Sequence, residues 1–423
     1  MKLQSKDHEK LLNVIDDLRA AGLSRHVPLP QIIVCGDQSS GKSSVLEAIS
    51  GLKFPTKDAL CTRFATELIL RRSPEEAFTA SIIPDDSRSE AEQRAISAAF
   101  DGEGDVEKDL GILVERAGKA MGVNGTSKNF ANDVLRLELS GPAQPHLTLV
   151  DLPGLFHAGS KAQSDADAVA VQELVTTYMA KPRSIILAVI SAKNDFNNQI
   201  VTKFAHQYDE HGNRTLGIIT KPDTLPAGSE SEKHFVPLAQ NKDVNFGLGW
   251  HVLKNREYEQ RNHTNEERNR SEKEFFEKGI WASLNRSGAG VDALCPRLSN
   301  VLRDQILNEL PSMMEEVQNE AEICRGRLDV LGASRGTLQE QRLHLLLVSE
   351  NFTTIIKEAV AGRYDSDYFG DPTSEAGYLK RIRAKTTNLQ QKFADAARLK
   401  GHKYEIVDQV PSTESKATPI KVS

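Results

Sequence analysis

The feature that most limits the possible folds is the segment at residues 36–43, whose sequence is GDQSSGKS. It matches the pattern GxxxxGK[ST], in which glycines permit a tight turn and backbone N–H groups enclose phosphate oxygens. The apolar run before it, residues 32–35, is typical of a buried central strand, and residues that favour a helix follow it. A plain glycine-rich turn is the alternative interpretation, but strand, loop and helix occur in the order that phosphate binding requires. The segment therefore predicts an α/β domain that binds a nucleotide.

Several side chains of this loop have defined tasks in phosphate binding. The ammonium of Lys42 is expected between the β- and γ-phosphates, and the hydroxyl of Ser43 is the expected Mg²⁺ ligand. The positive end of the following helix adds to the attraction. The residues of this segment predicted to bind the nucleotide are Gly36, Asp37, Ser40, Gly41, Lys42, Ser43 and Ser44.

A second motif, Asp151-Leu152-Pro153-Gly154, follows a run with strand character at residues 146–150. Asp151 can hold Mg²⁺ through a water molecule, and the N–H of Gly154 can sense whether the γ-phosphate is present. The tetrapeptide is weak evidence by itself. Behind a phosphate loop it indicates a nucleotide-dependent switch.

A third motif, Thr220-Lys221-Pro222-Asp223, identifies the base. The carboxylate of Asp223 can accept hydrogen bonds from N1–H and the 2-amino group of guanine, and adenine offers no such pair of donors. Lys221 would lay its stem along the base, and Asn255 and Arg256 would add a base or ribose contact. The motif could also be a simple turn, and an ATPase is the disfavoured alternative; GTP is the predicted substrate.

One expected side chain is missing. Small GTPases often use a glutamine directly after the DxxG glycine to orient the attacking water, and here that position is Leu155. Gln38 and Ser39 lie in the phosphate loop itself and are polar, so they are the candidates for this task. Solvation of the loop is the alternative role for both.

The rest of the chain divides into a sheet region and a helical region. Strands are expected at the apolar or alternating runs 32–35, 66–70, 135–139, 146–150, 185–190, 215–219 and 251–253, and helices between several of them. Residues 85–132 are predicted to be a helical insertion, and the charged run 256–273 a solvated loop or helix face. Helices are expected at 6–21, at 291–310 with an end at Pro311, at 338–361 and at 378–399.

Charge and cysteine content exclude several function classes. The 423 residues carry a formal charge of -6, which argues against a nucleic-acid partner. The four cysteines form no CxxC pair, so neither a zinc site nor a disulfide framework is indicated. No signal-peptide pattern and no long apolar run are present. We therefore predict a cytoplasmic protein whose membrane contact, at organelle surfaces, is peripheral.

The motifs GDQSSGKSS, DLPG, TKPD and KNR, with Cys61-Thr62-Arg63 between the first two, together resemble the dynamin superfamily of large GTPases, in its fungal dynamin and Mx-like branch. The likeness extends from the N-terminal helix to about Arg398. It implies an α/β P-loop GTPase domain with a mixed, mainly parallel central sheet flanked by helices, followed by an all-α partial bundle and stalk. Pro311 would be a hinge, and the chain would be C-terminally short of the full stalk.

The resemblance also implies a mechanism. Gln38 and Ser39 would position water and offset charge, and Thr62 would contact both Mg²⁺ and the catalytic water. The implied catalytic set is Gln38, Ser39, Lys42 and Thr62, and the implied metal ligands are Ser43, Thr62 and Asp151. A monovalent cation, Na⁺ or K⁺, would replace an arginine finger, although Lys57 and Ala59 stand where relatives often have glycine.

The predicted domains are an N-terminal bundle helix, a GTPase domain, a bundle helix with a hinge, a partial stalk and a disordered tail, at residues 1–27, 28–290, 291–311, 312–400 and 401–423. The expected function is GTP hydrolysis with Mg²⁺, activated by pairing of GTPase domains, with a family role in membrane remodelling and contacts to membranes or to microtubules. The alternative is a GTP-binding regulatory module that does not assemble, because the stalk is incomplete.

Overall fold

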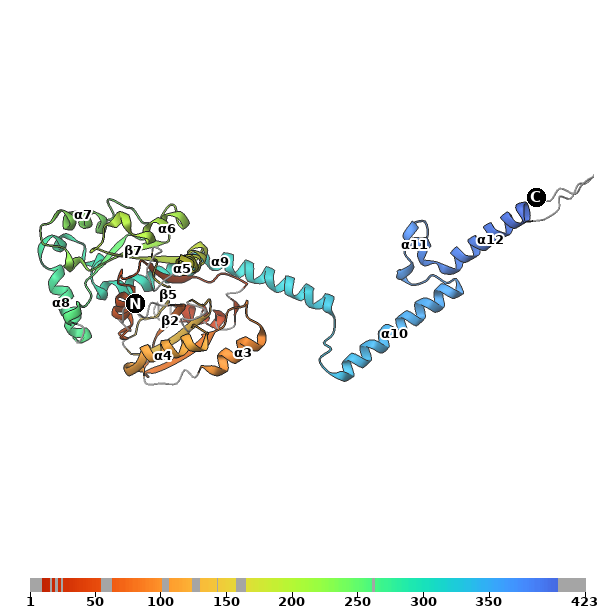
Figure 1. The fold of residues 1–423 in the computed structure, drawn as a ribbon, viewed down its shortest axis with the longest axis horizontal. Helices are drawn as coiled ribbons and strands as arrows, with labels where there is room; N and C mark the ends of the chain where they lie inside the picture. Colours follow the sequence, from red (N-terminus) through yellow and green to blue (C-terminus); the bar gives the residue numbers. More distant parts are fainter. Residues whose placement is uncertain are drawn as a thin grey trace, which may run out of the picture. The chain divides into compact units, whose positions relative to one another are not determined.

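The computed structural model describes residues 10–15, 17–19, 22–23, 26–54, 63–100, 106–123, 130–142, 144–156, 165–260 and 263–401. The chain forms two compact units, Met1–Glu322 and Ile323–Ser423 (Figure 1). The first unit contains all the strands of the central sheet. The described part of the second unit is helical.

The first unit is built on an eight-stranded sheet with the order β3-β4-β2-β5-β1-β6-β7-β8. Its strands are β1 (Gln31–Gly36), β2 (Ala65–Arg72), β3 (Ala77–Ile83), β4 (Val134–Gly141), β5 (Leu147–Asp151), β6 (Ser184–Ser191), β7 (Thr215–Thr220) and β8 (Trp250–Leu253). Only the β2–β5 and β3–β4 pairs are antiparallel. The predicted mixed, mainly parallel sheet is confirmed. The carboxyl ends of β1, β5, β7 and β8 lie at one edge, where ligands bind in sheets of this kind.

Helices cover both faces of the sheet. Those of the first unit are α2 (Lys42–Ser50), α3 (Glu90–Ala99), α4 (Val106–Ala120), α5 (Asp165–Ala180), α6 (Ile200–Tyr208), α7 (Glu230–Ala239), α8 (Asn265–Phe276) and the first part of α9 (Val291–Leu331). Successive residues of β1 belong to two different hydrophobic clusters, Ile32 to one and Ile33 to the other. This two-sided burial explains the uninterrupted apolar run at residues 32–35.

The N-terminal segment packs as its sequence predicts. Residues 10–15 and 17–19 are helical, and Leu12 and Ile15 are buried in the same cluster as Leu302 and Ile306 of α9. An amphipathic helix must cover its apolar stripe, and this cluster provides the cover.

The sequence prediction missed β3, the edge strand. Its residues alternate between more and less exposed positions, and most are small or polar, so the run has little apolar signal. Pairing with β4, which places Phe78 opposite Leu139 and Ile82 opposite Leu135, makes it a strand. The helical insertion at residues 85–132 is confirmed by α3 and α4.

The prediction that a helix ends at Pro311 is wrong, because α9 continues through this residue to Leu331. Proline inside a helix removes a hydrogen bond and costs about 3 kcal/mol. Arg183, just before β6, compensates by contacting α9 on both sides of the proline. Its guanidinium donates to Glu309 at 3.0 Å, to Ser312 at 2.8 Å and to Glu316 at 2.8 Å.

The second unit contains α10 (Leu338–Ala361), α11 (Glu375–Lys380) and α12 (Ile382–Lys400). α10 has the predicted bounds, with a Thr337 capping box and Gly362 in the left-handed conformation after its end. The single helix expected at 378–399 is instead broken at Arg381. The buried guanidinium of Arg381 donates to the backbone carbonyls of Phe369, Gly370 and Gly377, and thereby ties α12 to the preceding loop.

Among the described residues, no helix has the length and apolar content needed to cross a bilayer.

Candidate functional site

The phosphate loop connects β1 to α2, as its motif predicts. Gly36 allows the close approach that the loop needs, because a Cβ atom there would lie 2.5 Å from the Val189 carbonyl oxygen and 2.6 Å from the Ser40 hydroxyl. Gly41 has φ +99°, which L side chains rarely adopt. These constraints keep the backbone N–H groups at the start of α2 accessible to an anion.

The charged residues of the loop have different surroundings. Lys42 is only 8 % exposed, and its ammonium donates to the Gly36 carbonyl at 3.2 Å, so the side chain folds back over the loop. The carboxylate of Asp37 accepts from the backbone N–H groups of Ile200 at 2.9 Å and Val201 at 3.0 Å. Asp37 therefore fastens the phosphate loop to the first turn of α6.

The DxxG loop lies directly against the phosphate loop. The N–H of Leu155 donates to the Gly36 carbonyl at 3.1 Å, and the N–H of Gln38 donates to the Leu155 carbonyl at 2.7 Å. A Cβ atom on Gly154 would approach the Lys42 ammonium nitrogen to 2.9 Å. Asp151, at the end of β5, is buried beside them. A movement of the DxxG loop would therefore displace the phosphate loop.

The residues discussed for water positioning differ in exposure. Leu155 is 3 % exposed and packs in a core cluster, so its side chain contacts protein and not solvent. Gln38 and Ser39 are exposed, and Ser39 has φ 62°. Thr62 lies outside the described residues, as do Lys57 and Ala59.

The guanine motif is joined to the phosphate loop by side chains. Thr220 donates to the Ser40 carbonyl at 2.5 Å, and the Lys221 ammonium donates to the Ser39 carbonyl at 2.8 Å. Burial lowers the pKa of Lys221, and the nearby Lys193 lowers it further. The phosphate loop and the guanine motif, which are far apart in the sequence, are thus hydrogen-bonded to each other.

Asp223 and Asn255 carry buried polar atoms that lack a partner within the described part of the chain. These atoms are Oδ1 of Asp223 and Nδ2 of Asn255. Burial raises the pKa of Asp223, and the carboxylate of Glu257 raises it further. An unpaired buried polar atom costs about 1–3 kcal/mol, so a ligand that supplies the partners is favoured.

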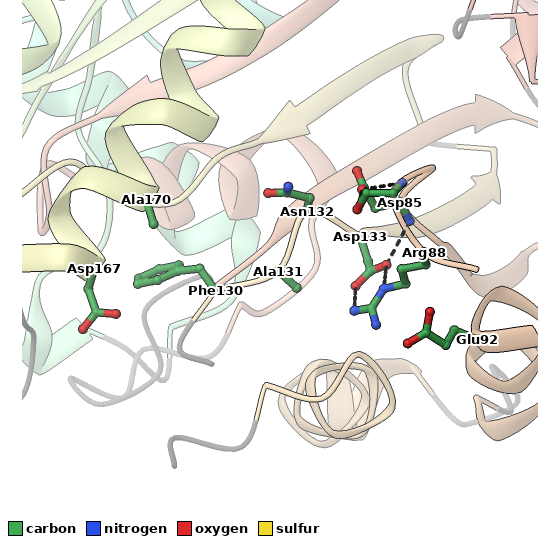
Figure 2. Close-up of a pocket in the computed structure, with 10 residues that line it drawn as sticks. Asp85, Arg88, Glu92, Phe130, Ala131, Asn132, Asp133, Asp167 and Ala170 are labelled. Carbon is green, nitrogen blue, oxygen red and sulfur yellow. Dashed lines mark hydrogen bonds and ion pairs between the residues drawn. The ribbon is translucent and has the colours of Figure 1, made fainter. Parts of the chain in front are cut away.

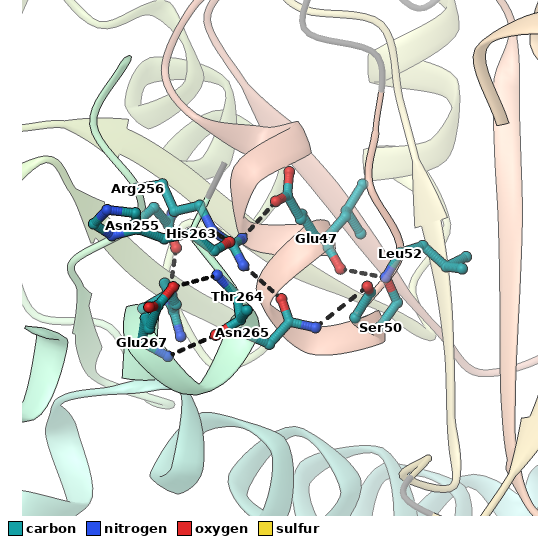
Figure 3. A network of polar contacts seen from close by, with 12 residues as sticks. Glu47, Ser50, Leu52, Asn255, Arg256, His263, Thr264, Asn265 and Glu267 are labelled. Atoms are coloured by element: carbon teal, nitrogen blue, oxygen red, sulfur yellow. Dashed lines mark hydrogen bonds and ion pairs between the residues drawn. The ribbon is translucent and has the colours of Figure 1, made fainter. Parts of the chain in front are cut away.

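Arg256 is placed differently from its neighbour Asn255. Its guanidinium donates to the Glu47 carboxylate on α2 at 2.6 Å, to the His263 carbonyl at 2.9 Å and to the Asn265 side chain at 2.7 Å (Figure 3). The described contacts of Arg256 therefore connect the loop after β8 to the helix of the phosphate loop.

The prediction of a solvated charged run at 256–273 is wrong for two residues of α8. Arg268 and Glu272 are 4 % and 3 % exposed and form an ion pair at 3.2 Å. Their other partners, Lys254, Asn255 and Val291, lie on segments outside α8, which the charge pattern of the run does not reveal. The spacing of four residues between opposite charges is the signal that could have drawn attention to them.

The metal ligands predicted within the described residues fit Mg²⁺ by their chemistry. Ser43 offers a hydroxyl and Asp151 a carboxylate, and the phosphate oxygens of a nucleotide and water would supply the other ligands that Mg²⁺ prefers. The described residues contain no cluster of three or more His, Cys, Asp or Glu that could hold a metal ion without a nucleotide.

A cavity of about 390 Å³ is lined by residues outside the three motifs (Figure 2). Asp85, Arg88, Phe130, Asp133 and Asp167 are among its lining residues. Arg88 pairs with the buried carboxylate of Asp133, and the Asp85 N–H donates to the same carboxylate at 2.9 Å. Arg88 and Asp133 thus form an internal ion pair that joins the segment after β3 to the start of β4.

Comparison with known proteins agrees with this geometry. Residues 32–222 match the model of the Dynamin family, and residues 235–414 match the model of the Dynamin central region. Interferon-induced GTP-binding protein Mx2 of Oncorhynchus mykiss is 30 % identical over 355 residues, which are 82 % of this chain and 53 % of that protein. Interferon-induced GTP-binding protein Mx of Siniperca chuatsi is 30 % identical over 357 residues, 83 % of this chain and 54 % of that protein.

The chain spans about half the length of the curated relatives it matches. The fungal branch within the family stays a prediction. The two family models match successive regions that include the phosphate and DxxG motifs and the first three residues of the guanine motif, and they extend through the helical region. The chain belongs to the dynamin superfamily.

Proposed function

We propose that this chain binds GTP together with Mg²⁺ and hydrolyses it to GDP and phosphate. The observation that carries the proposal is the hydrogen bonding of both other motif loops to the phosphate loop. Leu155 bonds to Gly36 and Gln38, and Thr220 and Lys221 bond to Ser40 and Ser39. The Mx relatives are named as GTP-binding proteins, which supports the same substrate.

Phosphate binding is assigned to the phosphate loop and its lysine. Backbone N–H groups between Gly36 and Ser44 would surround the β- and γ-phosphates, and Lys42 would exchange its bond to the Gly36 carbonyl for phosphate oxygens. Ser43, Asp151 and Thr62 would hold Mg²⁺, which neutralises charge that develops on the phosphates.

Water activation is assigned to the exposed polar residues of the loop. Gln38 and Ser39 would orient a water molecule for in-line attack on the γ-phosphate, with Thr62 as a further contact. The burial of Leu155 supports this assignment, because the usual glutamine position is occupied by a core residue. The N–H of Gly154 would report the presence of the γ-phosphate to the DxxG loop.

Base recognition is assigned to Asp223, with Asn255 beside it. The unpaired Oδ1 atom of Asp223 can accept from N1–H or the 2-amino group of guanine. Lys221 would cover the base with its stem, and Arg256 would contribute by holding the loop after β8 to Glu47. Adenine would leave the buried carboxylate unpaired, which disfavours ATP.

We further propose that two copies pair through the nucleotide face, that a monovalent cation assists, and that the protein acts in the cytoplasm at membranes or the cytoskeleton. The exposure of Gln38 and Ser39 on that face supports pairing. A GTP-binding module that does not assemble is the competing proposal. Turnover per molecule should rise with protein concentration if pairing activates hydrolysis, and a constant rate would favour the competing proposal.

The site itself is tested with Lys42→Ala. We expect loss of detectable GDP and GTP binding in titration calorimetry, because removal of a buried ammonium leaves the phosphate charge uncompensated. Lys233→Ala, a change at an exposed lysine on α7, is the matched control and should bind as the wild type does. Unchanged affinity of Lys42→Ala would overturn the assignment of the site.

A further inference from the structure

The ion pair between Arg268 and Glu272 on α8 is buried and is therefore not a surface ion pair. Its two side chains are 3 % and 4 % exposed. Burying two charges is unfavourable unless additional hydrogen bonds satisfy the remaining donors and acceptors. The partners of the pair therefore indicate which segments it holds.

Glu272 joins two segments that are separate in the sequence. Its carboxylate accepts from the backbone N–H of Lys254 at 2.9 Å and from the backbone N–H of Val291 at 2.9 Å. Lys254 is the first residue after β8, and Val291 is the first residue of α9. Glu272 thus fixes the start of the loop that follows β8.

Arg268 contacts the next residue of that loop. Its guanidinium donates to Oδ1 of Asn255 at 2.7 Å. Arginine has donors and no acceptor, so it can only hold the oxygen end of the amide. The Nδ2 end must then be directed away from Arg268, and this buried atom has no partner among the described residues.

The loop that carries Asn255 lies beside the proposed base-binding carboxylate. The two loops leave neighbouring strands, because Thr220 of β7 pairs with Leu253 of β8. Lys254 and Glu257 both act electrostatically on Asp223. Arg256 bonds to Glu47 of the phosphate-loop helix. Asn255 therefore belongs to a loop that leaves the strand next to that of the guanine motif and that is bonded to the phosphate-loop helix.

We infer that Arg268 is a positioning residue for nucleotide recognition: it sets the direction of the Asn255 amide, so that the Nδ2 hydrogens are available to an acceptor on the guanosine part of the ligand. The acceptor is an oxygen or nitrogen of the guanine edge or a ribose oxygen. Glu272 holds Arg268 and the loop in place. This inference rests on the proposed binding of guanosine nucleotides at residues 220–223 and 255.

A double-mutant cycle tests the inference by titration calorimetry with GDP. We expect Arg268→Met and Asn255→Ala each to weaken GDP binding about tenfold, which corresponds to the loss of one hydrogen bond to a buried group. The double variant should be no weaker than Asn255→Ala alone, because Arg268 acts through Asn255. Additive losses, about a hundredfold in the double variant, would overturn the inference.

Two further variants separate positioning from folding. Arg268→Lys keeps a positive charge beside Glu272, but a single ammonium cannot reproduce the planar fork that reaches both Glu272 and Asn255. We expect it to unfold at nearly the wild-type temperature and still to weaken GDP binding several-fold. Arg270→Met, at an exposed position on the same helix, should change neither property. Wild-type affinity in folded Arg268→Lys would refute the positioning role.

Analogues of GDP identify the acceptor. If Nδ2 contacts the ribose 2′-oxygen, the loss caused by Asn255→Ala should disappear with 2′-deoxy-GDP, and if it contacts N7 of guanine the loss should disappear with 7-deaza-GDP. Persistence of the loss with both assigns another guanosine acceptor. If wild-type protein fails to bind GDP, the proposed function is wrong and this inference falls with it. Binding by the wild type with additive losses refutes the inference alone.

Discussion

Arg183 offers the sharpest test of what stabilises α9 beyond Pro311. Its side chain is 6 % exposed and donates to Glu309 before Pro311 and to Ser312 and Glu316 after it. It also donates to the Pro28 carbonyl at 3.0 Å. We predict that Arg183→Met leaves the fold intact but allows α9 to open more easily beyond the proline.

The size of the effect follows from the exposure of the partners. Glu316 is 46 % exposed and Glu309 is 32 % exposed, so solvent weakens both ion pairs to about 0–1 kcal/mol each. The bond to Ser312 adds about 1 kcal/mol. Local opening after Pro311 should therefore become easier by about 1–3 kcal/mol, which is about a 5- to 150-fold increase in its equilibrium constant.

Amide hydrogen exchange measures this opening directly. Residues 312–322 should exchange about 5- to 150-fold faster in Arg183→Met, while amides of β1 and β6 keep their protection. The control is Arg303→Met, because Arg303 lies on the same helix and pairs only with its exposed neighbour Asp304 in the described contacts. Exchange within twofold of the wild type in Arg183→Met, or the same acceleration in the control, would refute the reasoning.

Two further predictions concern the base and the response to pH. Asp223→Asn should weaken GDP binding about a hundredfold and favour xanthosine diphosphate, since an amide can donate to the xanthine 2-oxygen. Calorimetry with both nucleotides tests this prediction, and Asp243→Asn, a change at an exposed position, is the control. Burial lowers the pKa of His251 to about 4, and its Nε2 lies 2.9 Å from the Gly290 carbonyl. As the pH falls from 6.5 towards 4, the unfolded state therefore binds the proton before the folded state does. The free energy of unfolding, measured with urea, should be about 2 kcal/mol lower at pH 5 than at pH 7, and His251→Gln should lack this loss.

Much of the fold could be predicted because its signals are local. The strands β1, β6 and β7 are apolar on both faces, and α10 carries its own capping box, so each element is readable from its own residues. The edge strand β3 could not be predicted in this way, because only pairing with β4 makes its weakly apolar run a strand. The end of the helix at Pro311 was predicted from the rule that proline ends a helix. The rule failed here because Arg183 contacts α9 on both sides of the proline.

The candidate site likewise has parts that could be predicted from local sequence and parts that could not. Its motifs are readable because phosphate and guanine binding require particular residues at fixed spacing along one loop, and the structure brings the described members together. The interpretation of residues 256–273 as solvated failed at Arg268 and Glu272, whose partners are Lys254, Asn255 and Val291. Arg256 illustrates the same point, because its bond to Glu47 crosses from one loop to the helix of another.

The sequence by itself thus determined the α/β class and the phosphate loop, because turn geometry and apolar periodicity are properties of short segments, and its motifs together carried the resemblance to the family. Only the tertiary structure decided the roles of its buried arginines. A guanidinium stands on a long side chain and has several donors, so its partners are residues that the fold brings near. Arg183 donates in this way to Glu316 of α9, and Arg268 donates to Asn255.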